Sequence, residues 1–139
     1  MKPFLRSTEE RQAIIDLIAT VLSERDAVMF AYVYGSFTRG PFRDIDIAIF
    51  VRDAGNTPEL YSLEYAVEQE LHAHTGFPVE VRALNTSPLP FAYTVISSGR
   101  VILSKDERAR SDFECRVITE YHDFSFYRKR YRREALGLV

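Results

Sequence analysis

The sequence predicts one α+β domain, and three observations lead to that fold class. Apolar residues recur at helical spacing over 14–22 and again over 60–71. Shorter apolar or alternating stretches between and after these segments indicate buried strands. The 139 residues contain no internal repeat, low-complexity tract or interior linker, so we predict a single domain over 1–139.

The first half of the chain begins with a helix. Ser7 and Glu10 have the spacing of a capping box, which predicts a helix that ends near 23–24. The apolar, aromatic-rich stretch 27–34 is short enough to be a buried strand. Isoleucines alternate along 44–51, which predicts a second strand with one buried face.

The second half repeats this alternation of elements. We predict a helix over 59–74, a strand over 79–84, a short helix over 91–97 and a strand over 100–103. Residues 104–107 read as a second capping box, with its serine as the cap, that opens a long charged helix.

Composition excludes several classes of protein. The net charge of −2 does not indicate a nucleic-acid binder, and nucleic acid is not an expected partner. Cys115 is the only cysteine, which rules out an intramolecular disulfide and a cysteine zinc site, and we expect it to be a small core residue. The first residues do not lead into an apolar signal-peptide core, and no run is long enough to span a membrane. We therefore expect a cytoplasmic protein.

The strand over 44–51 carries the candidate chemistry. Asp44 and Asp46 lie two apart, so their side chains project from the same face of the strand. Two carboxylates held this close repel each other unless a cation or a proton lies between them. Hard oxygen ligands without histidine or cysteine favour magnesium or manganese over zinc.

Gly35 and Ser36 follow the preceding strand, where the chain must turn sharply. Glycine lets the backbone approach a ligand, and free amides at a turn attract phosphate. An Asp-x-Asp pair alone usually belongs to a solvated strand end or a turn, and a Gly-Ser pair alone is only a turn. In this strand–turn–strand context, with Gly40 in the loop, they predict a site for a nucleoside triphosphate and magnesium.

At these residues the sequence resembles the polymerase-β-like nucleotidyltransferase superfamily. That resemblance implies a small mixed β-sheet flanked by helices, with a third acid on a later strand. Here that acid is Glu80, flanked by valines; the alternative for Glu80 is an exposed residue on an edge strand. The resemblance implies that Asp44, Asp46 and Glu80 hold two Mg²⁺ ions, with Mn²⁺ as an alternative, and catalyse displacement at the α-phosphate of ATP.

The chain as a whole resembles the minimal nucleotidyltransferase (MNT) group, the antitoxins of HEPN/MNT toxin–antitoxin pairs. The resemblance includes 84–88, 97–103 and the Tyr-x-Asp-Phe-x-x-Tyr pattern at 121–127. It implies an antitoxin that binds a HEPN-domain ribonuclease toxin and transfers AMP from ATP to a tyrosine of that toxin. Two departures are the short spacer before Asp44 and the glutamate at Glu80, where aspartate is frequent.

Three groups of cations have open roles. Arg39, in the loop before Asp44, is predicted either to bind the β- or γ-phosphate or to be a surface residue. Arg82 shares a face with Glu80, so we expect it to pair with the carboxylates. The basic run 128–133 indicates a solvated helix face or a docking helix for an acidic protein, in preference to a nucleic-acid site.

Three functions stay in competition. The first is an ATP-dependent protein adenylyltransferase that acts as an antitoxin. The second is a non-catalytic antitoxin that uses the same fold to occlude a toxin. The third is a nucleotidyltransferase for a small hydroxyl compound such as an aminoglycoside, although such relatives usually append a helical domain. The sequence leaves open the base, the acceptor and the oligomeric state, including a homo-oligomer.

Overall fold

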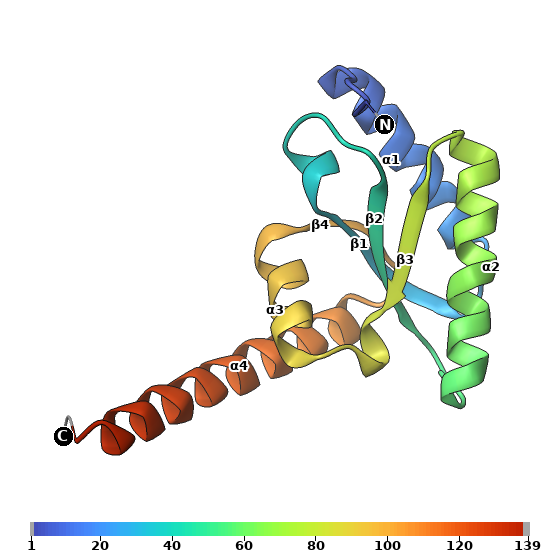
Figure 1. The fold of residues 1–139 in the computed structure, drawn as a ribbon. Helices are drawn as coiled ribbons and strands as arrows, with labels where there is room; N and C mark the ends of the chain where they lie inside the picture. The colour runs from blue at the N-terminus through green and yellow to red at the C-terminus, as the bar shows by residue number, and fades with distance from the viewer. Residues whose placement is uncertain (1, 138–139) are drawn as a thin grey trace.

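A computed structural model describes residues 2–137, apart from the side chains of 125–127. In chain order the elements are α1 (Thr8–Ser23), β1 (Val28–Tyr34), the 3-10 helix η1 (Ser36–Thr38), β2 (Ile45–Val51), α2 (Thr57–Thr75), β3 (Val79–Ala83), the 3-10 helix η2 (Leu84–Thr86), α3 (Leu89–Ser98), β4 (Arg100–Ser104) and α4 (Glu107–Ala135) (Figure 1). This confirms the predicted α+β fold. No helix in the described part of the chain is long and apolar enough to cross a membrane.

The four strands form one mixed sheet in the order β3-β2-β1-β4. β2 and β3 run parallel because α2 returns the chain between them, whereas the other neighbours are antiparallel. In this register Asp46 lies opposite Tyr34 on one side and Glu80 on the other. The crossover therefore brings acids from two distant parts of the sequence onto neighbouring strands.

Helices cover both faces of the sheet, as Figure 1 shows. Buried residues of α1 and α2 pack against one face, where the alternating isoleucines of β2 are fully buried. Residues of α3 and α4 pack with Phe30, Tyr32 and Ala48 against the other face. Asp46 shares the α3 and α4 face with Ala48, since the two residues lie two apart on β2. The end of β2 that carries Asp46 therefore lies on the same side of the sheet as α3.

The two predicted helix caps have different outcomes. Ser7 caps α1, and its backbone N–H donates to Glu10 at 3.1 Å, so that capping box is confirmed. The predicted cap at Ser104 is wrong, because this residue ends β4 and Asp106 accepts the backbone N–H of Ala109 at 3.0 Å. α4 therefore starts two residues later than the serine cap requires.

Three further expectations need correction. β2 begins at Ile45, so Asp44 lies in the turn before the strand and not in it. The apolar helical spacing predicted over 14–22 includes Leu17, but this residue is 37% exposed. Cys115 is exposed and not part of the core, because it lies on the opposite side of α4 from the buried Phe113 and Val117.

Side chains of α2 occupy the outer edge of β3. The backbone N–H of Val81 donates to Glu68 at 2.8 Å, and that of Ala83 donates to Glu64 at 2.9 Å. β3 is an edge strand, so these two amides have no strand partner on that side. The glutamates therefore fix the position of β3 relative to α2.

Candidate active site

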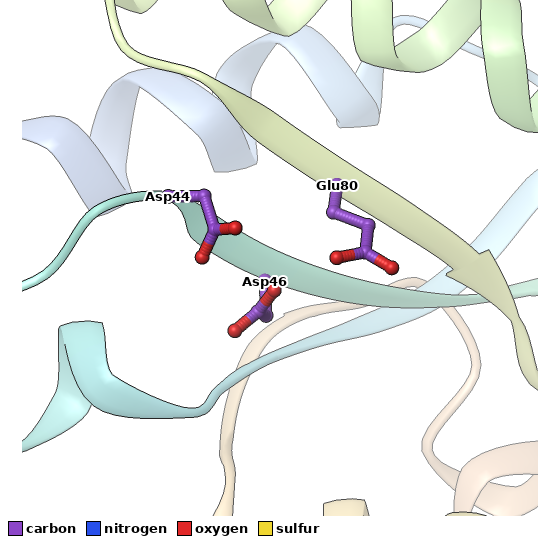
Figure 2. A group of neighbouring side chains, drawn as sticks. All are labelled: Asp44, Asp46 and Glu80. Atoms are coloured by element: carbon purple, nitrogen blue, oxygen red, sulfur yellow. The ribbon is translucent and has the colours of Figure 1, made fainter. Parts of the chain in front are cut away.

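Three carboxylates meet where β2 and β3 begin (Figure 2). Asp44 comes from the turn before β2, Asp46 from β2 and Glu80 from β3. One carboxylate oxygen from each lies within 4.8 Å of the others, and all three residues are partly buried. The predicted acids are therefore brought together, and Glu80 lies both on an edge strand and against Asp46.

The electrostatics of this cluster favour a bound cation. Burial, and then the neighbouring carboxylates of Asp44 and Glu80, raise the pKa of Asp46 from 3.8 to about 6. Arg82 opposes this shift only in part. At neutral pH the cluster thus holds closely spaced negative charge, which a divalent cation would neutralise.

Gly35 brings the backbone of the turn against this cluster. Its φ of +80° and ψ of −160° are allowed only for glycine. A Cβ added at this position would overlap Oδ2 of Asp46. The chain then enters η1 at Ser36, and the Thr38 hydroxyl donates to the Gly35 carbonyl at 2.7 Å. The predicted turn therefore lies directly against Asp46, one of the three predicted acids.

The loop between η1 and β2 is held from the N-terminal segment. The backbones of Phe4 and Phe42 exchange hydrogen bonds of 2.7 and 3.0 Å, and Arg11 donates to the Gly40 carbonyl at 3.2 Å. Arg39 is exposed in this loop, a position that suits both a phosphate ligand and a surface residue. Its contact with phosphate stays a prediction.

A wall of three side chains borders the acids. Arg82 donates to Glu80 at 2.9 Å, which confirms the expected pairing with a carboxylate. The Arg82 guanidinium also lies over Phe91 of α3, 5.5 Å from the ring centroid, and Phe91 meets the Tyr34 ring edge-on at 5.5 Å. Burial, and then the charge of Asp46, raise the pKa of Tyr34 above its ordinary value.

Sequence reasoning did not find Tyr34 and Phe91. Tyr34 directly precedes Gly35 and alternates with Val33, so its orientation toward the acids could have been read from the strand pattern. Phe91 offers no comparable signal, because only the docking of α3 on the sheet places it beside Arg82.

A glycine turn against Asp46, which clusters with Asp44 and Glu80, is the arrangement of a nucleotidyltransferase site. The family model described as "Polymerase beta, Nucleotidyltransferase" matches residues 16–108, a span that includes the turn and all three acids. The chain belongs to this family, and the resemblance to polymerase-β-like nucleotidyltransferases is confirmed. A search of curated proteins found no match.

Solved structures show the same fold over nearly the whole chain. One, described as a tri-AMPylated Shewanella oneidensis HEPN toxin in complex with MNT antitoxin, matches with a TM-score of 0.69 and 17% identity over 91% of this chain and 98% of that one. A toxin–antitoxin structure described as MntA–HepT matches with a TM-score of 0.64 and 16% identity over 94% and 99%. A toxin–antitoxin with AMP-PNP matches with a TM-score of 0.65 and 16% identity over 94% and 99%.

Proposed function

We propose that this chain transfers AMP from ATP to a tyrosine hydroxyl of a HEPN-type ribonuclease toxin and thereby acts as its antitoxin. The observation that carries this proposal is the contact between the Gly35 turn and the cluster of Asp44, Asp46 and Glu80. The solved structures described as an MNT antitoxin with an AMPylated HEPN toxin, and as a toxin–antitoxin with AMP-PNP, support the choice of acceptor and nucleotide.

The donor set fits a magnesium site. Three carboxylates within 4.8 Å offer only hard oxygen ligands. Burial, and then the charges of Asp44 and Glu80, raise the pKa of Asp46, and a cation would neutralise this charge. Asp44, Asp46 and Glu80 would hold two Mg²⁺ ions, or Mn²⁺ in their place. When bound, such ions lower the pKa of an attacking hydroxyl and neutralise charge on the phosphates.

The protein's own residues bind and orient the reactants. The Gly35 and Ser36 turn would place the triphosphate against the acids, and Arg39 would reach its outer phosphates from the exposed loop. The acceptor oxygen then bonds to the α-phosphorus as the bond to the leaving pyrophosphate breaks, and the hydroxyl proton passes to a carboxylate, for which we assign Glu80. Arg82 holds this carboxylate in place through its 2.9 Å contact.

The test is transfer of label from α-labelled ATP, with magnesium, to a purified HEPN protein. Asp44→Asn/Asp46→Asn should abolish labelling, because both substitutions remove cluster charge. Asp26→Asn/Asp112→Asn is the matched control, since it makes the same change of charge at exposed positions outside the cluster. Label that appears with the control and vanishes with the site variant supports the proposal.

Two other results would overturn it. A HEPN protein that is bound and inhibited but not labelled would make the chain an occluding antitoxin without catalysis. Labelling of an aminoglycoside or another small hydroxyl compound, and not of the protein, would select the small-molecule function. In the described part of the chain only α4 follows the last strand.

A further inference from the structure

α4 is longer than its contacts with the sheet require. Its first half packs on the domain: Phe113 and Val117 are buried, and Tyr121 stacks on Tyr93 of α3 with ring centroids 3.8 Å apart. Beyond Tyr121 every described side chain of α4 is exposed. Figure 1 shows this distal part projecting away from the other elements. About half of the helix therefore lies outside the fold.

The buried face of α4 continues along the projecting part. Phe113, Val117, Phe124 and Tyr131 share one face, because they are separated by four, seven and seven residues. Phe124 is 49% exposed and Tyr131 is 75% exposed, with Arg128 between them on the same face. We call Phe124, Arg128 and Tyr131 the distal stripe. It continues the buried face of α4 with two aromatic rings and one cation, and these three side chains are exposed in the described part of the chain.

A pocket lies where this face leaves the domain. It has a volume of about 300 Å³, and its lining includes Leu84, Leu89 and Ala92 from the η2 and α3 side and Phe113, Val117 and Glu120 from α4. From Phe113 to Tyr131 the combined surface extends for about 27 Å at ~1.5 Å per residue. This recess is partly polar, because Asn85, Ser87 and Arg116 also line it. Together with the helical stripe it has the shape that receives another amphipathic helix.

The charge of the projecting part indicates the chemistry of that helix. Residues 124–136 contain five cations and one acid, a net charge of +4, which leaves −6 on the rest of a chain whose total is −2. A second copy would bring the same five cations against themselves, which disfavours pairing of two distal stripes. A helix with carboxylates beside its apolar seam complements this surface.

We propose that the pocket and the distal stripe dock an acidic amphipathic helix of the protein acceptor. This inference rests on the proposed function in one respect: the protein that docks on this surface is taken to be the acceptor of AMP. The pocket residue Leu84 lies beyond the far end of β3 from Glu80, so docking and chemistry use different parts of the molecule. Docking there would raise the local concentration of the acceptor tyrosine near the acids.

The test compares surface variants in binding and in transfer to the HEPN protein. Phe124→Ser/Tyr131→Ser should raise both the Kd for the HEPN protein and its KM about tenfold or more, while the KM for ATP stays unchanged. Arg128→Glu should weaken binding several-fold more than Lys129→Glu. These two variants change the net charge equally, but Lys129 lies about 100° further around the helix. An unchanged melting temperature checks that each variant is folded.

Each further outcome decides between the proposals. Equal binding and labelling by all four proteins, or no binding of the HEPN protein by wild type, overturns the docking surface. If wild type binds the HEPN protein without labelling it, and the stripe variant loses that binding, the docking surface is supported and the proposed function is refuted. Loss of binding to a single-stranded RNA oligonucleotide in the stripe variant, with HEPN binding intact, reassigns the surface to RNA and overturns the proposal.

Discussion

Neutralising Asp46 should stabilise the metal-free protein even though it removes a carboxylate of the candidate site. Oxygens of Asp44 and Glu80 lie within 4.8 Å of an Asp46 oxygen. Burial first, and then these two charges, raise the pKa of Asp46 from 3.8 to about 6. Asp46→Asn keeps the shape of the side chain and removes the charge. Above pH 6 the variant therefore avoids the cost of burying this charge beside two others, a cost that the unfolded chain does not have.

The magnitude follows from the two pKa values. A change from 3.8 to about 6 corresponds to about 3 kcal/mol. Because Asp46 is only partly buried, solvent screening reduces the expected effect on the free energy of unfolding to about 1–2 kcal/mol. The folded state keeps the proton to a higher pH than the unfolded state, so wild-type stability falls as the pH rises from about 4 to about 6.

Urea unfolding in EDTA at pH 4 and pH 8 measures this difference. Asp46→Asn should be more stable than wild type by about 1–2 kcal/mol at pH 8, and the two should nearly coincide at pH 4. The exposed control Asp26→Asn should stay within about 0.5 kcal/mol of wild type at both values. A variant that is less stable than wild type at pH 8, or a gain that is equal at pH 4 and pH 8, would refute the reasoning.

Three other predictions test the surroundings of the cluster. Gly35→Ala should lower the free energy of unfolding by about 1–3 kcal/mol, because of the positive φ and the overlap with Asp46. It should also reduce AMP transfer about 100-fold. Thermal unfolding and the labelling assay measure these changes, and full activity would contradict the prediction. Magnesium should raise the melting temperature of wild type and not that of Asp44→Asn/Asp46→Asn. An equal melting temperature of wild type with and without magnesium would show that the cluster binds no cation. Asn85→Ala should cost about 1–3 kcal/mol in urea unfolding, because Asn85 exchanges hydrogen bonds of 3.0 and 2.9 Å with the backbone of Val51; an unchanged midpoint would show that water replaces both bonds.

Local patterns in the sequence predicted most of the fold and the central part of the site. The same-face placement of Asp44 and Asp46 follows from strand alternation, although Asp44 lies just before β2. The position of Glu80 needed the family resemblance, because its contact with Asp46 depends on parallel pairing across the α2 crossover. Phe91 could not be placed from sequence, since tertiary packing of α3 determines what it touches.

The wrong predictions have local physical causes. Ser104 and Asp106 both precede α4 and both can cap a helix, and the pattern alone does not choose between them. Ser104 pairs with Phe30 as the last residue of β4, so it cannot also cap α4. The burial expected for Cys115 rested on the usual preference of cysteine for the core, and the phase of α4 outweighs that preference.

The two glutamates of α2 that cap β3 also protect the protein from self-association. An edge strand with free amides is a template on which another chain can add a strand, and such growth leads to amyloid-like aggregates. Glu64 and Glu68 already accept from Ala83 and Val81, so an incoming strand would first have to displace two charged acceptors. The edge that carries Glu80 can thus remain open to ligands while it is closed to sheet extension.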